Sequence, residues 1–344
     1  MTSTLVARWL SRVVLLAAVA LAAPAPAGAQ SLNLYTTREP GLITPLIEAF
    51  GKATGIKVNT IFVRDGLAER VAAEGAKSPA DVLMTVDFGE LITLVDRGLT
   101  QPTASTALEQ AIPAHLRGEK GDWFALSLRA RVLYAEKDLP FTTFTYEELA
   151  DPKCKGKVCI RSGQHPYNTA LIAAYLAKYG EARTEAWLRG IKANLGRAAT
   201  GGDRDVARDI MGGICDIGIA NSYYVGLMRS GAGGADQQKW GAAIKVILPT
   251  FQNGGTQVNI SGASVARHAP NRAAAVRFLE YLASPEAQKI YAEANFEYPV
   301  NGSAVVHPII AALGTLRTDT LPLAEIAKHR AAASRLVDKV GFDQ

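Results

Sequence analysis

The segment "SLNLYTTREPGLITPLIEAFGKATGIKVNTIFV" (residues 31–63) decides the fold of this chain. Residues 31–37 are typical of a β-strand. Residues 42–55 place apolar side chains on one face of a helix, which Gly55 ends. Residues 56–63 alternate between polar and apolar side chains, so we expect a second strand. A strand, a helix and a strand in so short a stretch predict parallel strands joined by a crossover helix.

The alternation of strands and helices continues beyond this segment. Residues 66–76 and 88–99 are typical of helices, and residues 80–86 form a nearly continuous apolar strand between them. Residues 122–136 are rich in strand formers and interrupt the alternation, and a second set of strands and helices occupies 157–224. The pattern predicts an α/β fold of two lobes with a cleft between them. Ligands of such sheets bind at the carboxyl ends of the strands.

Sequence motifs of enzymes are absent from the chain. It contains no G-x-S-x-G, no H-E-x-x-H, no Walker loop, and no G-x-G-x-x-G after a predicted strand. The segment "GGTQVNISG" (254–262) is rich in glycine but lacks the lysine of a phosphate-binding loop, so we expect a solvated connection there. We therefore expect that the protein is not an enzyme.

The first thirty residues differ from the rest of the chain. Arg8 and Arg12 precede the apolar run Val13–Ala22, and a Pro/Ala-rich stretch ends at the A-x-A motif before residue 30. This order is that of a secretory signal peptide, residues 1–29, which is cleaved on export to the periplasm. The alternative is a membrane anchor, but the apolar run is short for a membrane span and prolines follow it directly.

Length and composition are those of a globular protein of two domains or one large one. The 344 residues are 48% hydrophobic and 20% charged, and the formal charge is +5. The basic residues are dispersed and no nucleic-acid-binding motif is present, so we expect no nucleic acid partner.

Three cysteines occur in the chain. Cys154 and Cys159 bracket the short segment "CKGKVC", and in an oxidising compartment they can close a small disulfide. The alternative is two free thiols in a turn. Cys215 lies in an apolar run, which favours a buried packing role.

Three tyrosines lie at the ends of predicted strands. Tyr223 and Tyr224 close one strand in "NSYY", and Tyr167 follows Pro166 on another strand-end loop. Neighbouring side chains of a strand point to opposite faces, so a pair serving one core is awkward. A small, highly charged cation favours anionic oxygen ligands, and three phenolates would neutralise a trivalent ion. From the residues alone, ordinary core or rim aromatics are the alternative.

Five stretches together resemble the periplasmic ferric-iron-binding proteins of ABC transporters: "LNLYTTRE", "ADVLMTVD", "LSLRARVLYAEKD", "LADPKCKGKVCIRSGQHPYN" and "GICDIGIANSYYVGLM". The likeness runs from about Ser31 to the C-terminal helices. It implies an α/β periplasmic-binding-protein-like type II fold, with two lobes, each a central mixed sheet flanked by helices, and a ligand cleft between them. It also implies that the protein binds Fe(III) and delivers it to an inner-membrane ABC permease. We expect a monomer.

The resemblance also implies the metal ligands. The twin tyrosines of the family correspond to Tyr223 and Tyr224, and a third tyrosine corresponds to Tyr167. On the loop after the first strand, "TTREP" has Glu39 and Pro40 where one branch of the family has a histidine–tyrosine pair, and Glu39 either replaces that ligand or pairs with Arg38.

A synergistic anion such as carbonate, or water, completes the coordination in the family. Arg131 matches the arginine near that anion, Arg129 faces the same side of its strand, and Asn221 is a supporting residue. Ser162 and Gly163 are expected to present backbone N–H groups at the start of a helix.

A carboxylate occupies the place of a second asparagine of anion-holding relatives. Asp203 repels an anion there unless Arg204 offsets its charge. On the first lobe, Arg38, Glu39 and Asp87 are the candidates for contact with the loaded site.

The resemblance sets the domain boundaries. The first lobe is expected to comprise residues 30–130 plus about 256–300, and the second lobe residues 131–255 plus about 301–344. The alternative function is that of a sibling solute-binding protein for a small organic ion or for chelated iron.

Overall fold

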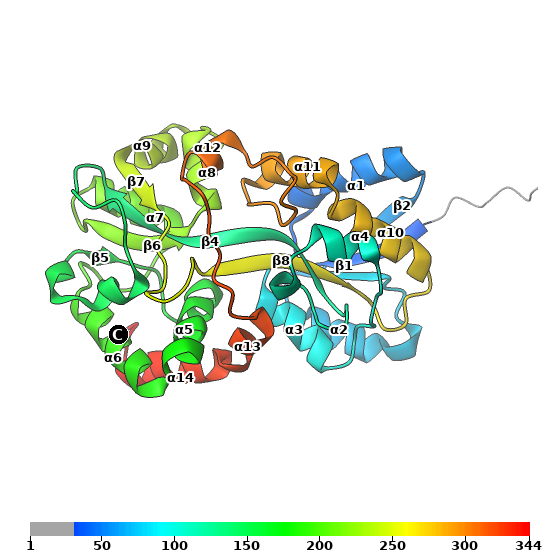
Figure 1. Cartoon of the computed structure of the whole chain (residues 1–344), viewed down its shortest axis with the longest axis horizontal. Coiled ribbons are helices and arrows are strands. Elements are labelled where there is room, and N and C mark those ends of the chain that lie inside the picture. The colour runs from blue at the N-terminus through cyan, green and yellow to red at the C-terminus, as the bar shows by residue number, and fades with distance from the viewer. Residues whose placement is uncertain (1–30) are drawn as a thin grey trace, which may run out of the picture.

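The computed structural model describes residues 31–344 (Figure 1). The predicted signal peptide lies outside the described residues. The strands are β1 (Ser31–Thr36), β2 (Lys57–Phe62), β3 (Val82–Thr85), β4 (Phe124–Glu136), β5 (Val158–Cys159), β6 (Ile217–Asn221), β7 (Ile244–Ile247) and β8 (Val258–Val265). The helices are α1 (Pro40–Thr54), α2 (Leu67–Glu74), α3 (Phe88–Asp96), α4 (Thr106–Ala111), α5 (Pro166–Tyr179), α6 (Glu181–Ala193), α7 (Asp203–Met211), α8 (Tyr223–Arg229), α9 (Ala235–Ala243), α10 (Arg272–Leu282), α11 (Pro285–Asn295), α12 (Pro308–Ala311), α13 (Leu323–Lys328) and α14 (Arg330–Val340).

The first lobe is built on the parallel strands β2, β1 and β3, with β8 antiparallel to β3. Helices α1, α2 and α3 connect or follow these strands, as the strand–helix alternation predicts. Gly55 ends α1 in the left-handed conformation, with φ 73°. Helices α10 and α11 return to this lobe late in the chain and pack against α1.

Strand β4 joins the two lobes. Its residues 124–130 pair with β8 of the first lobe, and residues 131–135 pair with β6 of the second. Figure 1 shows β4 and β8 running side by side through the centre of the molecule. Every β4 residue except the last is buried, so this long connection belongs to the core. Because β4 changes partner between Ala130 and Arg131, the strand is a continuous link between both sheets.

The second lobe contains the rest of β4 with β6, β5 and β7. Strands β5 and β6 are parallel, whereas β4 is antiparallel to both β6 and β7. Helix α14 packs against α5 and α6, and α13 contacts both α5 and α3. The last helices of the chain therefore reach the first lobe as well as the second (Figure 1).

The expectation of a solvated connection at 254–262 is wrong. Most of this segment is buried, and strand β8 begins inside it at Val258 and lies between β3 and β4. A Cβ on Gly262 would come within 2.6 Å of a Leu91 methyl and 2.8 Å of the Phe124 carbonyl oxygen. Glycine therefore permits close packing here.

The predicted disulfide between Cys154 and Cys159 is also wrong. Cys159 pairs instead with Cys215, at a Cα–Cα distance of 5.8 Å. Parallel pairing places Cys159 of β5 opposite Gly218 of β6, and Cys215 lies just before β6. Cys154 is a buried free thiol whose Sγ donates to the Glu148 carbonyl oxygen. The sheet, and not proximity along the chain, brings the bonded pair together.

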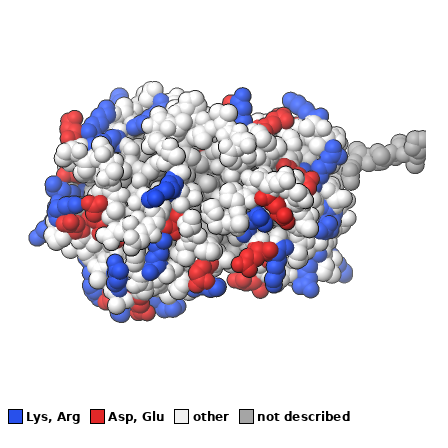
Figure 2. Space-filling view, viewed as in Figure 1, with Lys and Arg blue, Asp and Glu red and all other residues white. Residues whose placement is uncertain are grey.

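Surface charge is mixed on the face shown in Figure 2, where basic and acidic side chains are interspersed. That face carries no extended basic stripe of the kind that nucleic acids bind. Within residues 31–344, no helix has the length and apolar character needed to cross a bilayer.

Candidate metal centre

The three predicted tyrosines come together at the second lobe. Tyr167 is the second residue of α5, and its hydroxyl lies 3.4 Å from that of Tyr223. The rings of Tyr223 and Tyr224 are 4.1 Å apart between centroids and inclined by 34°. All three side chains are only partly buried. Their phenol groups therefore form one polar cluster that solvent still reaches.

The twin tyrosines begin a helix and do not close strand β6. Strand β6 ends at Asn221, and α8 starts at Tyr223. Successive residues of a helix differ by about 100° in direction, whereas those of a strand differ by 180°. The change from strand to helix is therefore what lets both neighbouring rings lie on one side.

Local capping holds Tyr167 in place. The Nδ1 atom of His165 accepts a hydrogen bond from the Tyr167 backbone N–H at 3.2 Å. Burial and the nearby Arg161 guanidinium lower the pKa of His165 to about 4, which keeps the ring nitrogen available as an acceptor. The Asn168 amide donates to the carbonyl oxygens of Arg161 and Ser162. These bonds fix the loop that enters α5.

A buried ion-pair network lies beneath the tyrosines. Arg131, 1% exposed, donates through Nη1 to Asp203 at 2.7 Å and to Asn221 at 3.0 Å, and through Nη2 to Asn168. Asp203 also accepts from Arg161 at 3.2 Å and from the Asn221 backbone N–H at 2.7 Å. Arg131 and Arg161 thus offset the Asp203 charge.

Arg204 does not serve that purpose. Its guanidinium bonds to Gln237 and lies 5.6 Å from the Tyr224 ring centroid. The expectation that Arg204 offsets Asp203 is therefore replaced by the Arg131–Asp203–Arg161 network, because those two guanidinium groups touch the carboxylate directly.

Three guanidinium groups surround the Tyr167 ring. The Cζ atoms of Arg161, Arg129 and Arg131 lie 5.3, 5.8 and 6.0 Å from its centroid. Arg129 donates to the carbonyl oxygens of Val86 and Ile260, at 2.8 Å for the latter. Positive charge this close stabilises an ionised phenol.

Burial raises the pKa of the twin tyrosines, whereas nearby positive charge favours the ionised phenol. Desolvation raises the pKa of Tyr223 well above its ordinary value, and the neighbouring Tyr167 and Tyr224 add to the rise, whereas Arg129 lowers it. Desolvation likewise raises the pKa of Tyr224. Both phenols are therefore neutral without a cation, and a bound cation must displace their protons.

The Ser162 side chain and the Gly163 backbone already bind a carboxylate of the chain itself. Asp343 accepts from the Ser162 hydroxyl at 2.6 Å, from the Gly163 N–H at 2.7 Å and from the Gln164 N–H at 3.3 Å. The loop presents donors as expected, but in this arrangement they serve the C-terminal segment.

The first lobe offers fewer uncommitted groups. Arg38, 2% exposed, pairs with buried Glu297 at 3.1 Å instead of with Glu39. Glu39 is exposed at the start of α1, and its side chain makes no capping bond there. Asp87 caps α3 by accepting from Gly89, and it also accepts from the Asn259 amide. Among residues 31–344, no three His, Cys, Asp or Glu side chains gather as a metal site.

Comparison with known proteins identifies the family of this chain. Residues 45–318 match a family described as bacterial extracellular solute-binding protein. The chain belongs to this family. It is 40% identical to iron uptake protein A2 of Synechocystis sp., over 93% of this chain and 92% of that protein.

Solved structures show the same type II two-lobed fold. A Bordetella ferric binding protein is 65% identical, covers 92% of this chain and 100% of its own, and superposes with a TM-score of 0.89. A Trichodesmium protein in complex with iron and citrate ligands is 40% identical, with coverages of 91% and 99% and a TM-score of 0.85. The predicted fold class is confirmed.

Sequence reasoning missed three residues at the centre of this solute-binding protein. Arg161 follows the short strand β5, and its place in a strand-end loop is the signal that identifies it. Asn168 directly follows Tyr167 in "HPYN". Glu297, the partner of Arg38, is 259 residues away in the chain and gives no local signal.

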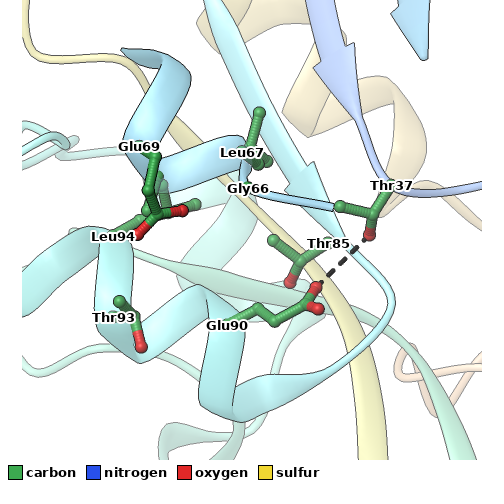
Figure 3. Close-up of a pocket in the computed structure, with 9 residues that line it drawn as sticks. Thr37, Gly66, Leu67, Glu69, Thr85, Glu90, Thr93 and Leu94 are labelled. Carbon is green, nitrogen blue, oxygen red and sulfur yellow. Dashed lines mark hydrogen bonds between the residues drawn. The ribbon is translucent and has the colours of Figure 1, made fainter. Parts of the chain in front are cut away.

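A separate cavity of about 180 Å³ lies within the first lobe (Figure 3). Figure 3 shows Glu90 of α3 pointing toward Thr37, at 3.5 Å between their oxygens. Desolvation in this pocket and the nearby Asp87 carboxylate raise the pKa of Glu90 to about 7. The tyrosines do not line this cavity, so it is distinct from the phenol cluster.

Proposed function

We propose that this solute-binding protein is the periplasmic component of an ABC importer, which binds Fe(III) and delivers it to an inner-membrane permease. The observation that carries the proposal is the convergence of Tyr167, Tyr223 and Tyr224, with two hydroxyls 3.4 Å apart. Relatives over nearly the whole chain are described as an iron uptake protein and a ferric binding protein.

Three phenolates suit a hard trivalent cation. Anionic oxygen ligands are preferred by such ions, and three of them balance its charge. Burial keeps the phenols of Tyr223 and Tyr224 protonated in the iron-free protein. Iron binding therefore releases their protons, and the surrounding arginines stabilise the anionic oxygens.

A synergistic anion such as carbonate completes the site in this proposal. Four buried donors around the tyrosines have no partner within residues 31–344: Nε of Arg129, Arg131 and Arg161, and Nδ2 of Asn221. Buried unpartnered donors are costly, so they favour an acceptor brought by the ligand. Asp203 does not repel this anion, because Arg131 and Arg161 neutralise it.

Both lobes take part in holding the ion. We assign residues 30–130 plus about 256–300 to the first lobe, and residues 131–255 plus about 301–344 to the second. Iron loads on the tyrosines first, and closure of the first lobe then brings exposed Glu39 toward it. The protein acts as a monomer after removal of the signal peptide.

Chelated iron is the second candidate ligand. A relative 40% identical to this chain was solved in complex with iron and citrate ligands. Citrate carboxylates match the unpartnered donors of Arg161 and Asn221 as well as carbonate does. Titration with iron in the presence of carbonate alone or of citrate distinguishes the two forms.

The test is a titration of the purified iron-free protein with ferric citrate. We expect a visible tyrosinate-to-iron charge-transfer band at one iron per chain. Tyr223→Phe should lose most of this band and weaken iron binding by about 100-fold or more, equivalent to about 2.7 kcal/mol. Tyr281→Phe is the matched control, because the Tyr281 hydroxyl is buried without a partner among the described residues.

Two results would contradict the proposal. One is a wild-type protein that stays colourless with iron. The other is a Tyr223→Phe variant with unchanged iron affinity.

A further inference from the structure

The C-terminal helix α14 contacts both sides of the candidate site. Its first residue, Arg330, forms an ion pair with Asp87 at the start of α3 in the first lobe. The Arg330 side chain is 22% exposed and that of Asp87 is 7% exposed, so the pair is largely shielded from water. The Arg330 guanidinium also lies 5.3 Å from the Phe88 ring centroid. One end of α14 is therefore anchored on the first lobe.

The Arg330 guanidinium lies directly over Gly89 of α3. A Cβ built on Gly89 would lie 1.8 Å from Arg330 Nη1 and 2.5 Å from its Cζ. The guanidinium thus fills the space that any larger residue at position 89 would occupy.

The other end of α14 holds the loop that leads to Tyr167. Just beyond the helix, Asp343 accepts three hydrogen bonds, from the Ser162 hydroxyl and from the N–H groups of Gly163 and Gln164. A Cβ on Gly163 would lie 2.9 Å from a Val337 methyl, so the loop rests directly on the helix. Two residues after Gln164, Pro166 begins α5.

The helix between these anchors is suited to transmit movement. Its 11 residues span about 16 Å at 1.5 Å per residue. Leu336 and Val337 are buried, 3% and 1% exposed, where α14 packs against α5 and α6. Packed helices move as rigid bodies, so displacement of one end is carried to the other.

We propose that α14 couples the position of the first lobe to the orientation of Tyr167, with Arg330 and Asp343 as the two positioning residues. The coupling rests on the proposed function, since Tyr167 must be an iron ligand for it to matter. The Arg330–Asp87 pair joins the two lobes and resists their separation, and α14 passes that restraint to the loop before Tyr167. Iron release is therefore slowed by a contact that touches neither iron nor tyrosine.

Loss of either anchor should make iron release faster. Coupling between two sites changes an equilibrium by about 5- to 150-fold, and a partly exposed ion pair belongs at the low end. We expect Arg330→Gln and Asp343→Asn each to speed iron release to an external chelator by about fivefold. The double variant should release iron no faster than the faster single variant, because one broken end already disconnects the helix.

The experiment follows loss of the charge-transfer band after mixing the iron-loaded full chain with a chelator. Arg335→Gln is the control, because Arg335 is exposed on the same helix and makes no ion pair within residues 31–344. It should release iron at the wild-type rate. Arg330→Lys and Asp343→Glu keep the charges and should restore most of the slow release. The wavelength of the band should shift in Asp343→Asn, since the Tyr167 oxygen is displaced.

Three outcomes would overturn the coupling. The first is a wild-type release rate in both single variants. The second is a double variant whose increase in release rate is the product of the two single increases. The third is an unchanged charge-transfer band in Asp343→Asn. If Arg330→Gln unfolds, Arg330→Met replaces it, since it keeps the aliphatic stem and removes only the ion pair with Asp87, and wild-type iron release from that variant would overturn the coupling. A colourless wild-type protein would instead mean that the proposed function has failed.

Discussion

The two faces of the cleft differ in how their polar groups are used. On the second lobe, the three tyrosines are backed by buried groups that bond to one another, with Arg131 joining Asp203, Asn221 and Asn168. On the first lobe, buried Arg38 forms an ion pair with Glu297 and is not available to a ligand. The contrast suggests that the second lobe is preorganised for the ion, whereas the first lobe contributes only when it closes.

The pH dependence of iron affinity is the largest effect that this contrast predicts. Burial raises the pKa of Tyr223 and of Tyr224, so both bind iron only by losing a proton. Affinity should therefore rise by about tenfold per pH unit for each phenol that ionises, or about 100-fold per pH unit for Tyr223 and Tyr224 together. Competition against a chelator of known pH dependence measures the slope. An ionised carboxylate from the first lobe releases no proton, so a slope near zero would contradict second-lobe phenolate binding.

The two buried ion pairs offer a matched comparison between the lobes. Arg38→Met leaves buried Glu297 without an arginine and should destabilise the protein by about 3–5 kcal/mol in urea unfolding, whereas Arg131→Met leaves Asp203 paired with Arg161 and should destabilise it less. Arg131→Met should weaken iron binding more than Arg38→Met does, because Arg131 bonds to Asn168 and Asn221 next to the tyrosines, whereas Arg38 bonds to Glu297. Equal losses of affinity in the two variants would show that the faces do not differ.

The smallest predicted effect concerns Glu90 of the first lobe. Asp203 of the second lobe pairs with two arginines, whereas Glu90 forms no such pair within residues 31–344. Desolvation raises its pKa from 4.5 to about 7, so the folded state binds its proton more tightly than the unfolded state. Its contribution to stability is present below about pH 4.5 and is lost as the pH rises through 7. Glu90→Gln should therefore raise the Tm at pH 8 and leave it nearly unchanged at pH 4. Glu48→Gln, on the exposed face of α1, is the control, and a lower Tm for Glu90→Gln at pH 8 would contradict the assignment.

Much of the second lobe was predictable because its signals are local. Apolar periodicity located β6, and two adjacent phenols drew attention to Tyr223 and Tyr224 without any knowledge of the fold. The change from strand to helix at Ser222 was not predictable in the same way. A short stretch such as "NSYY" carries no strong propensity, and tertiary packing decides its conformation.

What the sequence determined by itself was the order of strands and helices and the kind of chemistry that clustered phenols support. Those properties depend on neighbouring residues and on side-chain acidity. Tertiary structure alone decided which groups meet: Cys159 with Cys215, Arg131 with Asp203, and Asp87 with Arg330. These pairs are 56, 72 and 243 residues apart. Only the pairing of β5 and β4 with β6 and the packing of the last helices bring them within bonding distance, because local periodicity carries no information about distant partners.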